Sequence, residues 1–350
     1  MSTTAVPGPP AESQPVPPPS SPDGAPRTVR RRGAWILHTI VPLVPALVPV
    51  AIVVAIVFAL LSLAGMSIGL SLTPFSFRFR GPVNFGWAFF GSDFAPPYHW
   101  EIGVFIVGSF LTAIPALFLS MAIGLGIAIA STTYLPRSLT AWLDPFVDLL
   151  AGIPSVVFGI WAYAYAAPYF GVTINPWLSM HLGFIPGFGG SPGLPTGEGL
   201  PVTIFILTLM ALPITTLLIR DALRSLPRDL WESGLALGAT RWETMRRVGL
   251  PHGMRGILSA GFLGFGRAFG ETVAVAIVLG GASRYPTNFY GETGTMAATM
   301  FALLDSAYGN GQFLALLSEM AIVLLAITLA VNIVGRRFVS SFVGYEIAGM

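Results

Sequence analysis

Two ionisable side chains, Arg267 and Glu271, stand inside the otherwise apolar stretch 257–281. Their spacing of four residues predicts that they share one face of a helix. An ionised side chain at membrane depth is costly, and it usually faces a bundle interior or a wet pathway. Arginine stays protonated and offers a planar fork of donors that matches the oxygens of an oxyanion. Two hypotheses remain open: Arg267 attracts an anion while Glu271 holds its orientation, or the pair is a structural link between helices.

A second candidate is Pro154-Ser155 in the sequence GIPSVV. Proline has no backbone N–H and interrupts a helix. An unwound helix here would turn backbone N–H groups toward an anion, as half-helix ends do in transporters. A plain kink is the alternative. Glu319, in the last apolar stretch, is interpreted as a hydrogen-bond partner between packed helices.

The run WESGLALGATRWETMRRVGLP combines charge, glycine and tryptophan. Pro227, just before it, suits the first position of a helix, and Gly238 can take the left-handed conformation that ends one. Thr240 and Glu243 have the spacing of a capping box, which begins a second helix, and Pro251 is expected to end it. The run therefore predicts two short helices with a glycine break.

Four apolar residues of this run, Trp231, Leu235, Trp242 and Met245, form one stripe if the break bends little. Such a stripe either lies on the membrane surface or inserts into a partner protein.

The composition sets the class of protein to which these residues belong. Only 10% of the residues are charged, 54% are hydrophobic and the mean hydropathy is +0.74. A soluble domain carries about 25% charged residues, so most of this surface must face lipid or other apolar protein. We expect an all-α polytopic membrane protein. A helix needs about 20 apolar residues to cross the hydrocarbon layer, and six stretches qualify: 34–64, 102–131, 143–167, 201–219, 257–281 and 312–334.

The ends of the chain differ from its centre. Residues 1–33 are rich in proline and serine, which predicts a disordered tail. Residues 34–340 form the predicted permease domain, and 341–350 a short C-terminal tail. The stretch 168–200, rich in glycine, proline and aromatic residues, is predicted as an ordered outer loop, either passive or a docking surface.

All eighteen basic residues are arginine, and their distribution predicts the orientation. Fourteen lie in the N-terminal flank, the 132–142 loop, the 220–256 loop and the C-terminal flank, against three in the loops between. Basic residues favour the cytoplasmic side, so both termini and the 220–256 loop are expected there.

The 220–256 loop resembles a known signature. Glu232, Gly238, Val248, Leu250 and Pro251 fit the spacing of the EAA signature of ABC-importer permeases, which reads Glu-Ala-Ala, three residues, Gly, nine residues, Ile, one residue, Leu-Pro. The sequence departs from it in having Ser-Gly for the two alanines and valine for isoleucine. The resemblance implies the type I ABC-importer permease fold. It also implies that the loop, including Thr240 and Glu243, is the coupling helix that sits in a groove of an ATP-binding subunit.

Two further stretches, LAGIPSVVFGIWAYAYAAP and GRAFGETVAVAIVLG, resemble permeases of phosphate-specific (Pst) importers, in particular the PstC-type subunit. The resemblance covers about residues 85–340. It implies a PstA-like second permease, two PstB-like ATP-binding subunits, a PstS-like phosphate-binding protein and phosphate as the transported ion. On this interpretation Arg267, Glu271, Thr272, Pro154 and Ser155 line the path through a cell-membrane protein.

Three alternatives stay open: a PstA-type subunit, a permease for another oxyanion such as molybdate or sulfate, and a secondary transporter that works without ATP. A nucleotide-binding P-loop needs lysine, and the chain has none, so it is not itself the ATPase. The resemblance implies a transport permease subunit and no enzyme. With no cysteine and four scattered histidines, we expect no metal and no cofactor. No nucleic-acid partner is expected.

Overall fold

The computed structural model describes residues 49–63, 92–94, 98–100, 102–282, 285–308 and 311–348. The chain divides into two compact units, Met1–Ile56 and Val57–Met350. Of the first unit only residues 49–56 are described, and they belong to the apolar helix Pro49–Leu63. The predicted tail 1–33 and the first part of the predicted span 34–64 lie outside the described residues.

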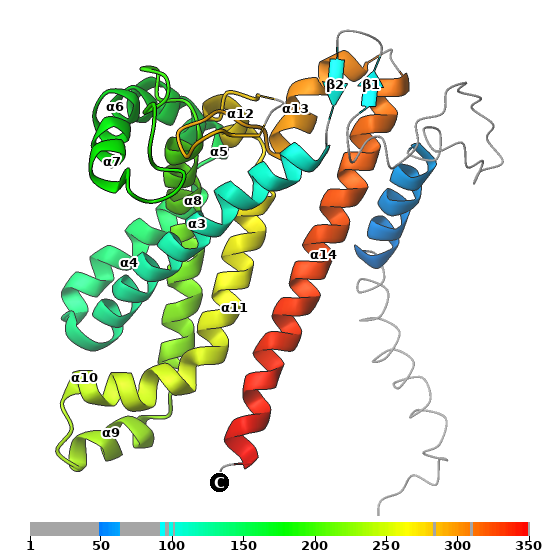
Figure 1. The fold of residues 1–350 in the computed structure, drawn as a ribbon. Coiled ribbons are helices and arrows are strands. Elements are labelled where there is room, and N and C mark those ends of the chain that lie inside the picture. Colours follow the sequence, from blue (N-terminus) through cyan, green and yellow to red (C-terminus); the bar gives the residue numbers. More distant parts are fainter. Residues whose placement is uncertain are drawn as a thin grey trace, which may run out of the picture. The chain divides into compact units, whose positions relative to one another are not determined.

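Helices dominate the described part of the second unit (Figure 1). Among the described residues, four helical stretches are long and apolar enough to cross a membrane: Ile102–Tyr134, Ser155–Leu182, Leu200–Arg224 and Leu314–Val339. They confirm the all-α membrane class and the predicted spans 102–131, 201–219 and 312–334. A short antiparallel hairpin of β1 (Ser92–Phe94) and β2 (Tyr98–Trp100) precedes the first of them.

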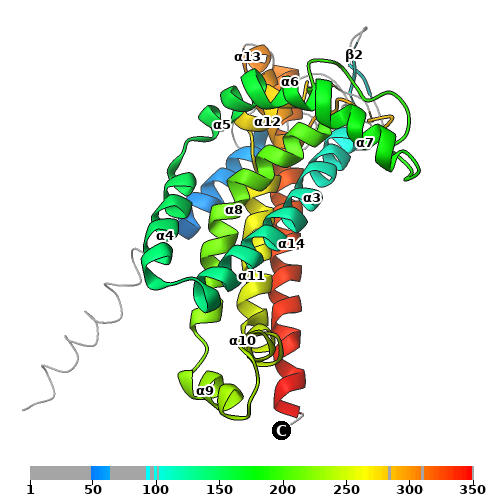
Figure 2. The same ribbon diagram turned by 90° about the vertical axis from the view of Figure 1, so that its left-hand side faces the viewer.

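The long helices alternate in direction. Helices α3 (Ile102–Ile129), α8 (Leu200–Arg224) and α14 (Gly311–Ala348) run toward the end of the unit that carries the C-terminus, and α11 (Leu250–Phe269) runs back (Figures 1 and 2). Helix α14 continues to Ala348, through most of the stretch predicted as a C-terminal tail.

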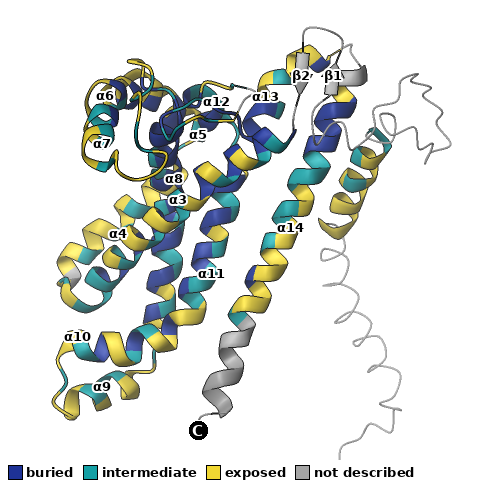
Figure 3. Ribbon diagram, in the orientation of Figure 1, coloured by how far each residue is buried: buried dark blue, intermediate teal, exposed yellow. Residues whose placement is uncertain are grey.

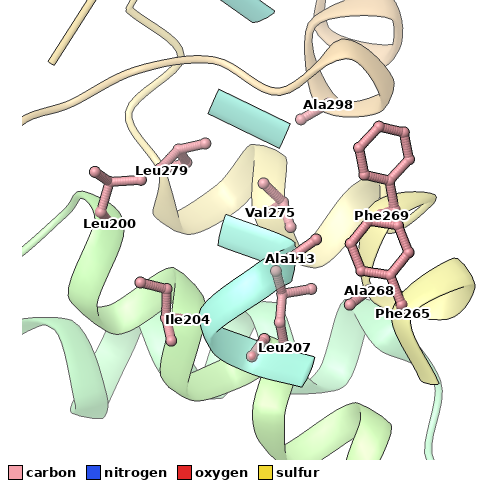
Figure 4. Close-up of a cluster of buried hydrophobic side chains, with 11 residues drawn as sticks. Ala113, Leu200, Ile204, Leu207, Phe265, Ala268, Phe269, Val275, Leu279 and Ala298 are labelled. Atoms are coloured by element: carbon pink, nitrogen blue, oxygen red, sulfur yellow. The ribbon is translucent and has the colours of Figure 1, made fainter. Parts of the chain in front are cut away.

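Helix α8 is the centre of the bundle and packs against α3 and α11. In its most apolar window 67% of the residues are buried, against 28% for the stretch Ser155–Leu182. The main core unites residues of α3, α8, α11, α12 (Val273–Val278) and α13 (Met296–Ala307) (Figure 4). Its buried members are Ala113, Ala116, Leu200, Ile204, Leu207, Phe265, Ala268, Phe269, Val275, Leu279 and Ala298.

Small residues allow α3 to approach its neighbours closely. A small residue is buried at every fourth position of its inner face: Gly108, Thr112, Ala116, Ser120, Gly124 and Ala128. A Cβ atom at Gly124 would lie 3.0 Å from the Oγ1 atom of Thr216 on α8. Lipid tails are as apolar as leucine, so membrane helices associate mainly through such close packing.

The predicted third span, 143–167, is divided in the structure. Helix α4 (Arg137–Gly152) ends where Ile153 and Pro154 adopt ψ angles of 127° and 141°. Helix then resumes at Ser155 as α5 (Ser155–Trp161), α6 (Ala167–Tyr169) and α7 (Asn175–Leu182), joined by π-helical segments. The loop predicted for 168–200 is therefore wrong over 168–182. Pro168 and Pro176 each follow one of these π-helical segments, whose widened turn accommodates a residue without an N–H.

The predicted fifth span, 257–281, is divided as well. Helix α11 ends at Phe269, residues 270–272 are not helical, and α12 begins at Val273. Gly270, with φ −91° and ψ 1°, leaves the helical region at this point. Glycine is a poor helix former, which is the local reason for the break.

The segments 183–199 and 285–295 form a cap at the end of the second unit opposite to the C-terminus (Figure 1). The rings of Phe188 and Phe289 stack at 4.3 Å, and Asn288 donates through Nδ2 to the Ser191 carbonyl at 2.9 Å. Tyr290 is buried and its hydroxyl donates to the Phe188 carbonyl at 3.1 Å. Burial raises the pKa of Tyr290, so this donor stays protonated.

Burial is uneven over the helices (Figure 3). Helices α8 and α3 carry the largest numbers of buried positions, whereas α4, the stretch 155–182 and the far half of α14 present exposed apolar side chains. A water-soluble protein does not leave such extensive apolar surface uncovered.

Candidate functional site

Two short helices stand at the end of the second unit that carries the C-terminus, α9 (Arg228–Ala236) and α10 (Arg241–Thr244) (Figures 1 and 2). Gly238, between them, has φ +84°, which confirms the predicted left-handed break. The Ala239 N–H donates to the Gly234 carbonyl at 3.2 Å and closes the turn. Pro227 lies one position before the first helical residue, not at it.

The predicted capping box is present at the start of α10. The Thr240 N–H donates to Glu243 Oε2 at 2.8 Å, and the Glu243 N–H donates to Thr240 Oγ1 at 3.2 Å. The hydrogen bond from the Thr240 backbone is the main cause that holds the pKa of Glu243 below its ordinary value. The carboxylate therefore remains charged as it fixes the first turn.

The prediction that Pro251 ends the second helix is wrong. Helix α10 passes through the π-helical segment Met245–Gly249 directly into α11, and Pro251 lies in the first turn of α11. A proline is tolerated at this point of the continuous helix because the widened π-turn before it gives its ring space and accommodates the missing N–H. The element that carries the signature is thus continuous with a long bundle helix.

The predicted single apolar stripe is also wrong. Met245 is buried and Trp231 partly buried, and both join a core cluster with Leu223 of α8 and Ile257 of α11. Leu235 and Trp242 are exposed, together with Leu237, which is 89% exposed. The reason is the fold-back of α9 on α10, which turns two members of the stripe inward and leaves an outward face made of the other two and Leu237.

Gly234, where the signature has an alanine, fits this fold-back. A Cβ atom at this position would lie 2.8 Å from Cγ2 and 3.0 Å from Oγ1 of Thr244, which is itself buried. The departure from the signature is therefore compensated by a threonine on the facing helix. A larger residue at 234 would push α9 away from α10.

Close contacts hold α8 and α11 together beside the α9–α10 pair. A Cβ atom at Gly253 of α11 would lie 3.2 Å from Cδ2 of Leu223, and one at Gly256 would collide with the side chain of Ala222. Leu223 also shares a core cluster with Met245. A displacement of α9–α10 must therefore move the end of α8 and the start of α11.

The second candidate group lies at the other end of α11. Arg267 is half-buried in the last turn of that helix, and its Nε atom is buried without a hydrogen-bond partner in the described part of the chain. Glu271 lies in the 270–272 break, so the prediction that it shares a helix face with Arg267 is wrong. The described residues show no ion pair between the two side chains. Thr272 donates through Oγ1 to the Gly270 carbonyl at 3.1 Å.

Pro154 and Ser155 mark the break between α4 and α5, so the helix is unwound there rather than kinked. Helix α5 packs on α12: a Cβ atom at Gly159 would lie 3.0 Å from Cα of Ala274. The two short helices that follow the breaks at 153–154 and 270–272 are therefore in contact. Sequence reasoning placed these segments on one path, and the fold brings them to the same part of the unit.

The two groups of candidate residues are far from each other. Arg267 and Pro251 lie near opposite ends of α11, a helix of 20 residues. At 1.5 Å per residue the helix is about 30 Å long, close to the hydrocarbon thickness of a membrane. One group of candidate residues lies at each end of α11. A change at one group can therefore reach the other only by movement of the helices between them.

Sequence reasoning missed a charged cluster between α4 and α8. Asp144 forms ion pairs with Arg220 and with Arg224, the second at 3.3 Å, and Arg220 is 5% exposed. The sequence does contain a signal for this cluster. Asp144 stands in the apolar stretch 143–167, and Arg220 and Arg224 are one helical turn apart just after the apolar stretch 201–219. The two arginines had been assigned to the solvated loop 220–256.

The remaining polar candidates are easily placed. Glu319 is buried on α14, next to the core residues Leu317 and Met320. Within the described ranges, no three histidine, aspartate or glutamate side chains come together as a metal site would need.

Residues 122–343 match the family of binding-protein-dependent transport system inner membrane components. A relative from Mesorhizobium japonicum, named phosphate transport system permease protein PstC, is 33% identical over 77% of this chain and 83% of its own length. Phosphate transport system permease protein PstC 1 of Mycobacterium tuberculosis is 37% identical over 67% of this chain and 70% of its own.

Solved structures show the same fold at low sequence identity. A chain of a bacterial alginate ABC transporter, crystallised with an alginate pentasaccharide-bound periplasmic protein, superposes with a TM-score of 0.57 at 17% identity. The likeness covers 90% of this chain and 99% of that one. The fold is therefore that of an ABC-importer permease. Together with the matched span and the relatives, this places the chain in the family of binding-protein-dependent transport system inner membrane components, among the relatives named PstC.

Proposed function

We propose that this chain is the membrane-spanning permease subunit of an ATP-driven phosphate importer. The observation that carries the proposal is the folded α9–α10 pair, joined without interruption to a bundle helix whose far end holds Arg267. The relatives named PstC supply phosphate as the transported ion. The chain itself is a permease and not an enzyme, and ATP hydrolysis belongs to a separate subunit.

The α9–α10 pair is the coupling element. Leu235, Leu237 and Trp242 form its outward face, which has the apolar character of a surface that inserts into a protein groove. Glu232 is exposed on the same pair of helices. When two PstB-like ATP-binding subunits close, their movement reaches the bundle through Met245 and Leu250, because α10 continues into α11.

The anion path passes the breaks at 153–154 and 270–272. Arg267 supplies a half-buried positive charge whose buried Nε atom has no hydrogen-bond partner among the described residues, and we expect it to attract an oxyanion to this depth. Glu271, Thr272, Pro154 and Ser155 line the same region. Because Glu271 is not paired with Arg267, its role on the path is its own rather than that of holding the arginine.

The remaining partners follow from the same assignment. A PstA-like permease completes the path across a pseudo-two-fold axis, and a PstS-like phosphate-binding protein docks on the cap formed by 183–199 and 285–295. The arginine distribution supports a cytoplasmic position for the α9–α10 end and both termini of a cell-membrane protein. The cap then faces outward.

The decisive experiment is reconstitution. The chain is expressed together with the PstA-like permease, the two PstB-like ATP-binding subunits and the PstS-like binding protein. The complex is purified from membranes and placed in phospholipid vesicles with ATP on the α9–α10 side. We expect uptake of labelled phosphate that requires both ATP and the binding protein. An excess of unlabelled phosphate abolishes the uptake, and equal concentrations of sulfate or molybdate leave it unchanged.

Three outcomes contradict the proposal in different ways. Uptake that persists without the ATP-binding subunits indicates a secondary transporter. Competition by molybdate or sulfate at least as strong as that by phosphate indicates another oxyanion. A chain that never co-purifies with an ATP-binding subunit is not a permease of this type.

A further inference from the structure

Helix α4 is held to the bundle by unusually little. No described side chain of α4 is buried, and Trp142, Phe146 and Leu149 are each more than half exposed. Among its described side chains, Asp144 alone forms ion pairs or hydrogen bonds with another helix. The polar contact between α4 and α8 therefore depends, among the described side chains, on one carboxylate.

That carboxylate has two partners one helical turn apart on α8. Arg220 is buried, with a side chain only 6% exposed, and its Nε atom has no further hydrogen-bond partner among the described residues. Arg224 is about half exposed and donates from Nη2 to Asp144 Oδ2 at 3.3 Å. Loss of Asp144 would leave the Arg220 guanidinium buried without a counter-charge, which is the costly way to break a buried pair.

The arginine side of this cluster is fixed to the coupling element. Leu223, between the two arginines, packs in one cluster with Met245 and with Trp231 of α9. Arg241 of α10 also reaches the Thr133 carbonyl, just before α4, at 3.4 Å. We therefore expect a shift of α9–α10 to displace the end of α8 with which Asp144 forms its ion pairs.

The aspartate side leads to the other candidate group. Helix α4 is followed by the break at Ile153–Pro154 and then by α5, whose Phe158 shares a core cluster with Ala274 and Val278 of α12. Helix α12 in turn begins directly after the 270–272 break. Asp144 thus links α9–α10 to that break by a route through α4 and α5, separate from α11.

We propose that Asp144 is a positioning residue that makes α4 follow the coupling element, so that movement at α9–α10 reaches α5 and α12 as well as α11. The inference rests on the proposed function, since it concerns how ATP-driven movement reaches the anion path. A merely structural Asp144 would change how much complex assembles. A positioning Asp144 changes how much phosphate each assembled complex moves per ATP hydrolysed.

The test compares Asp144→Asn with Asp148→Asn in the reconstituted five-subunit complex. Asp148 lies one turn further along α4, is exposed and forms no ion pair with any described residue, so it is the matched control. Phosphate uptake and ATP hydrolysis are both measured per assembled complex. We expect Asp144→Asn to lower the ratio of phosphate to ATP about fivefold or more, a coupling of the usual size, and Asp148→Asn to leave it unchanged.

Two further variants complete the design. Asp144→Glu keeps the carboxylate and is expected to restore most of the ratio. Arg224→Gln removes the half-exposed partner and leaves Arg220 paired, so it is expected to assemble normally and to lower the ratio less than Asp144→Asn. If Asp144→Asn fails to assemble, Arg224→Gln decides: a reduced ratio supports the inference and a wild-type ratio overturns it.

The outcomes for the inference and for the proposed function are distinct. Wild-type complex that takes up phosphate, with equal ratios in Asp144→Asn and Asp148→Asn, overturns only the inference. Equal losses of uptake and ATP hydrolysis in Asp144→Asn, with the ratio unchanged, also overturn it. Wild-type complex that takes up no phosphate contradicts the proposed function instead.

Discussion

At the scale of single residues, the least expected finding concerns Arg267 and Glu271. The sequence spacing makes them neighbours on a helix, but the helix ends at Phe269 and the two side chains form no ion pair within the described residues. A half-buried arginine without a carboxylate partner among the described residues keeps its attraction for a passing anion. The two residues should therefore act independently.

A double-mutant cycle of Arg267→Gln and Glu271→Gln measures this independence. We expect Arg267→Gln to lower phosphate uptake about tenfold or more, because hydrogen bonds to charged groups contribute about 1.5–3 kcal/mol. Arg267→Lys keeps the charge without the fork and should fall between. The interaction energy of the cycle should be below about 0.5 kcal/mol, as for residues that share no contact. A larger value, measured at equal assembly, would show that the two residues are coupled after all.

Glu243 provides a prediction about pH. Its pKa in the folded protein lies below its ordinary value of 4.5 because the Thr240 backbone donates to the carboxylate. The stabilisation of the first turn of α10 is therefore complete above that ordinary value and is lost as the pH falls through the lower, folded value. Hydrogen exchange at residues 240–244, corrected for the intrinsic rate, should show the turn opening in acid. Glu243→Gln, which cannot titrate, should remove the pH dependence, and Asp229→Asn on α9 should not.

At the scale of elements, close packing of α3 on α8 is the feature most open to test. Gly124 and Gly126 lie two positions apart on α3, but only Gly124 faces α8. Gly124→Leu would force its side chain against Thr215 and Thr216, and overpacking of this kind costs about 1–3 kcal/mol. We expect the purified complex that carries Gly124→Leu to have a lower melting temperature than the wild-type complex. Tryptophan fluorescence measures the melting of both.

Gly126→Leu is the matched control, because a Cβ atom there meets nothing within 4 Å. It introduces the same side chain into the same helix and should melt close to the wild type. Equal melting temperatures for the two variants would mean that α3 does not approach α8 through Gly124.

The elements also show what the sequence can and cannot predict. The capping box and the Gly238 break were predictable because their signals are local: a hydrogen bond three residues away and a positive φ. The fold-back that buries Met245 and exposes Trp242 was not, because it depends on Gly234 packing against Thr244. The long helices were predictable from the length of the apolar stretches. The breaks at 153–154 and 270–272 were not predictable in the same way, because many other glycines and prolines in these stretches do not interrupt a helix.

The charged cluster illustrates the same limit over a longer distance. Asp144 and Arg224 are 80 residues apart in the chain, and the local sequence around either residue does not predict the other as its partner. The sequence showed only that each charge stands near an apolar segment. The packing of α4 beside α8 decides the pairing.

At the scale of the whole second unit, the α9–α10 pair and the cap lie at opposite ends (Figure 1). The chain has no cysteine, so single cysteines report cleanly on which side of the membrane each end lies. We expect Leu237→Cys to react with a membrane-impermeant thiol reagent only in inside-out vesicles. Phe184→Cys, in the cap, should react only in right-side-out vesicles; both native side chains are more than 80% exposed. Reaction of Leu237→Cys from the outside would reverse the proposed orientation.

The glycines of the cap have a consequence for how this protein tolerates change. Gly193, Gly197 and Gly199 all have positive φ, and a Cβ atom on Gly197 would collide with the Ala167 carbonyl. At these positions every alternative amino acid is penalised by its backbone as well as its volume. A saturation-mutagenesis survey should find almost no permitted substitution at these three positions. Stepwise point mutation can therefore hardly change the backbone of this part of the cap.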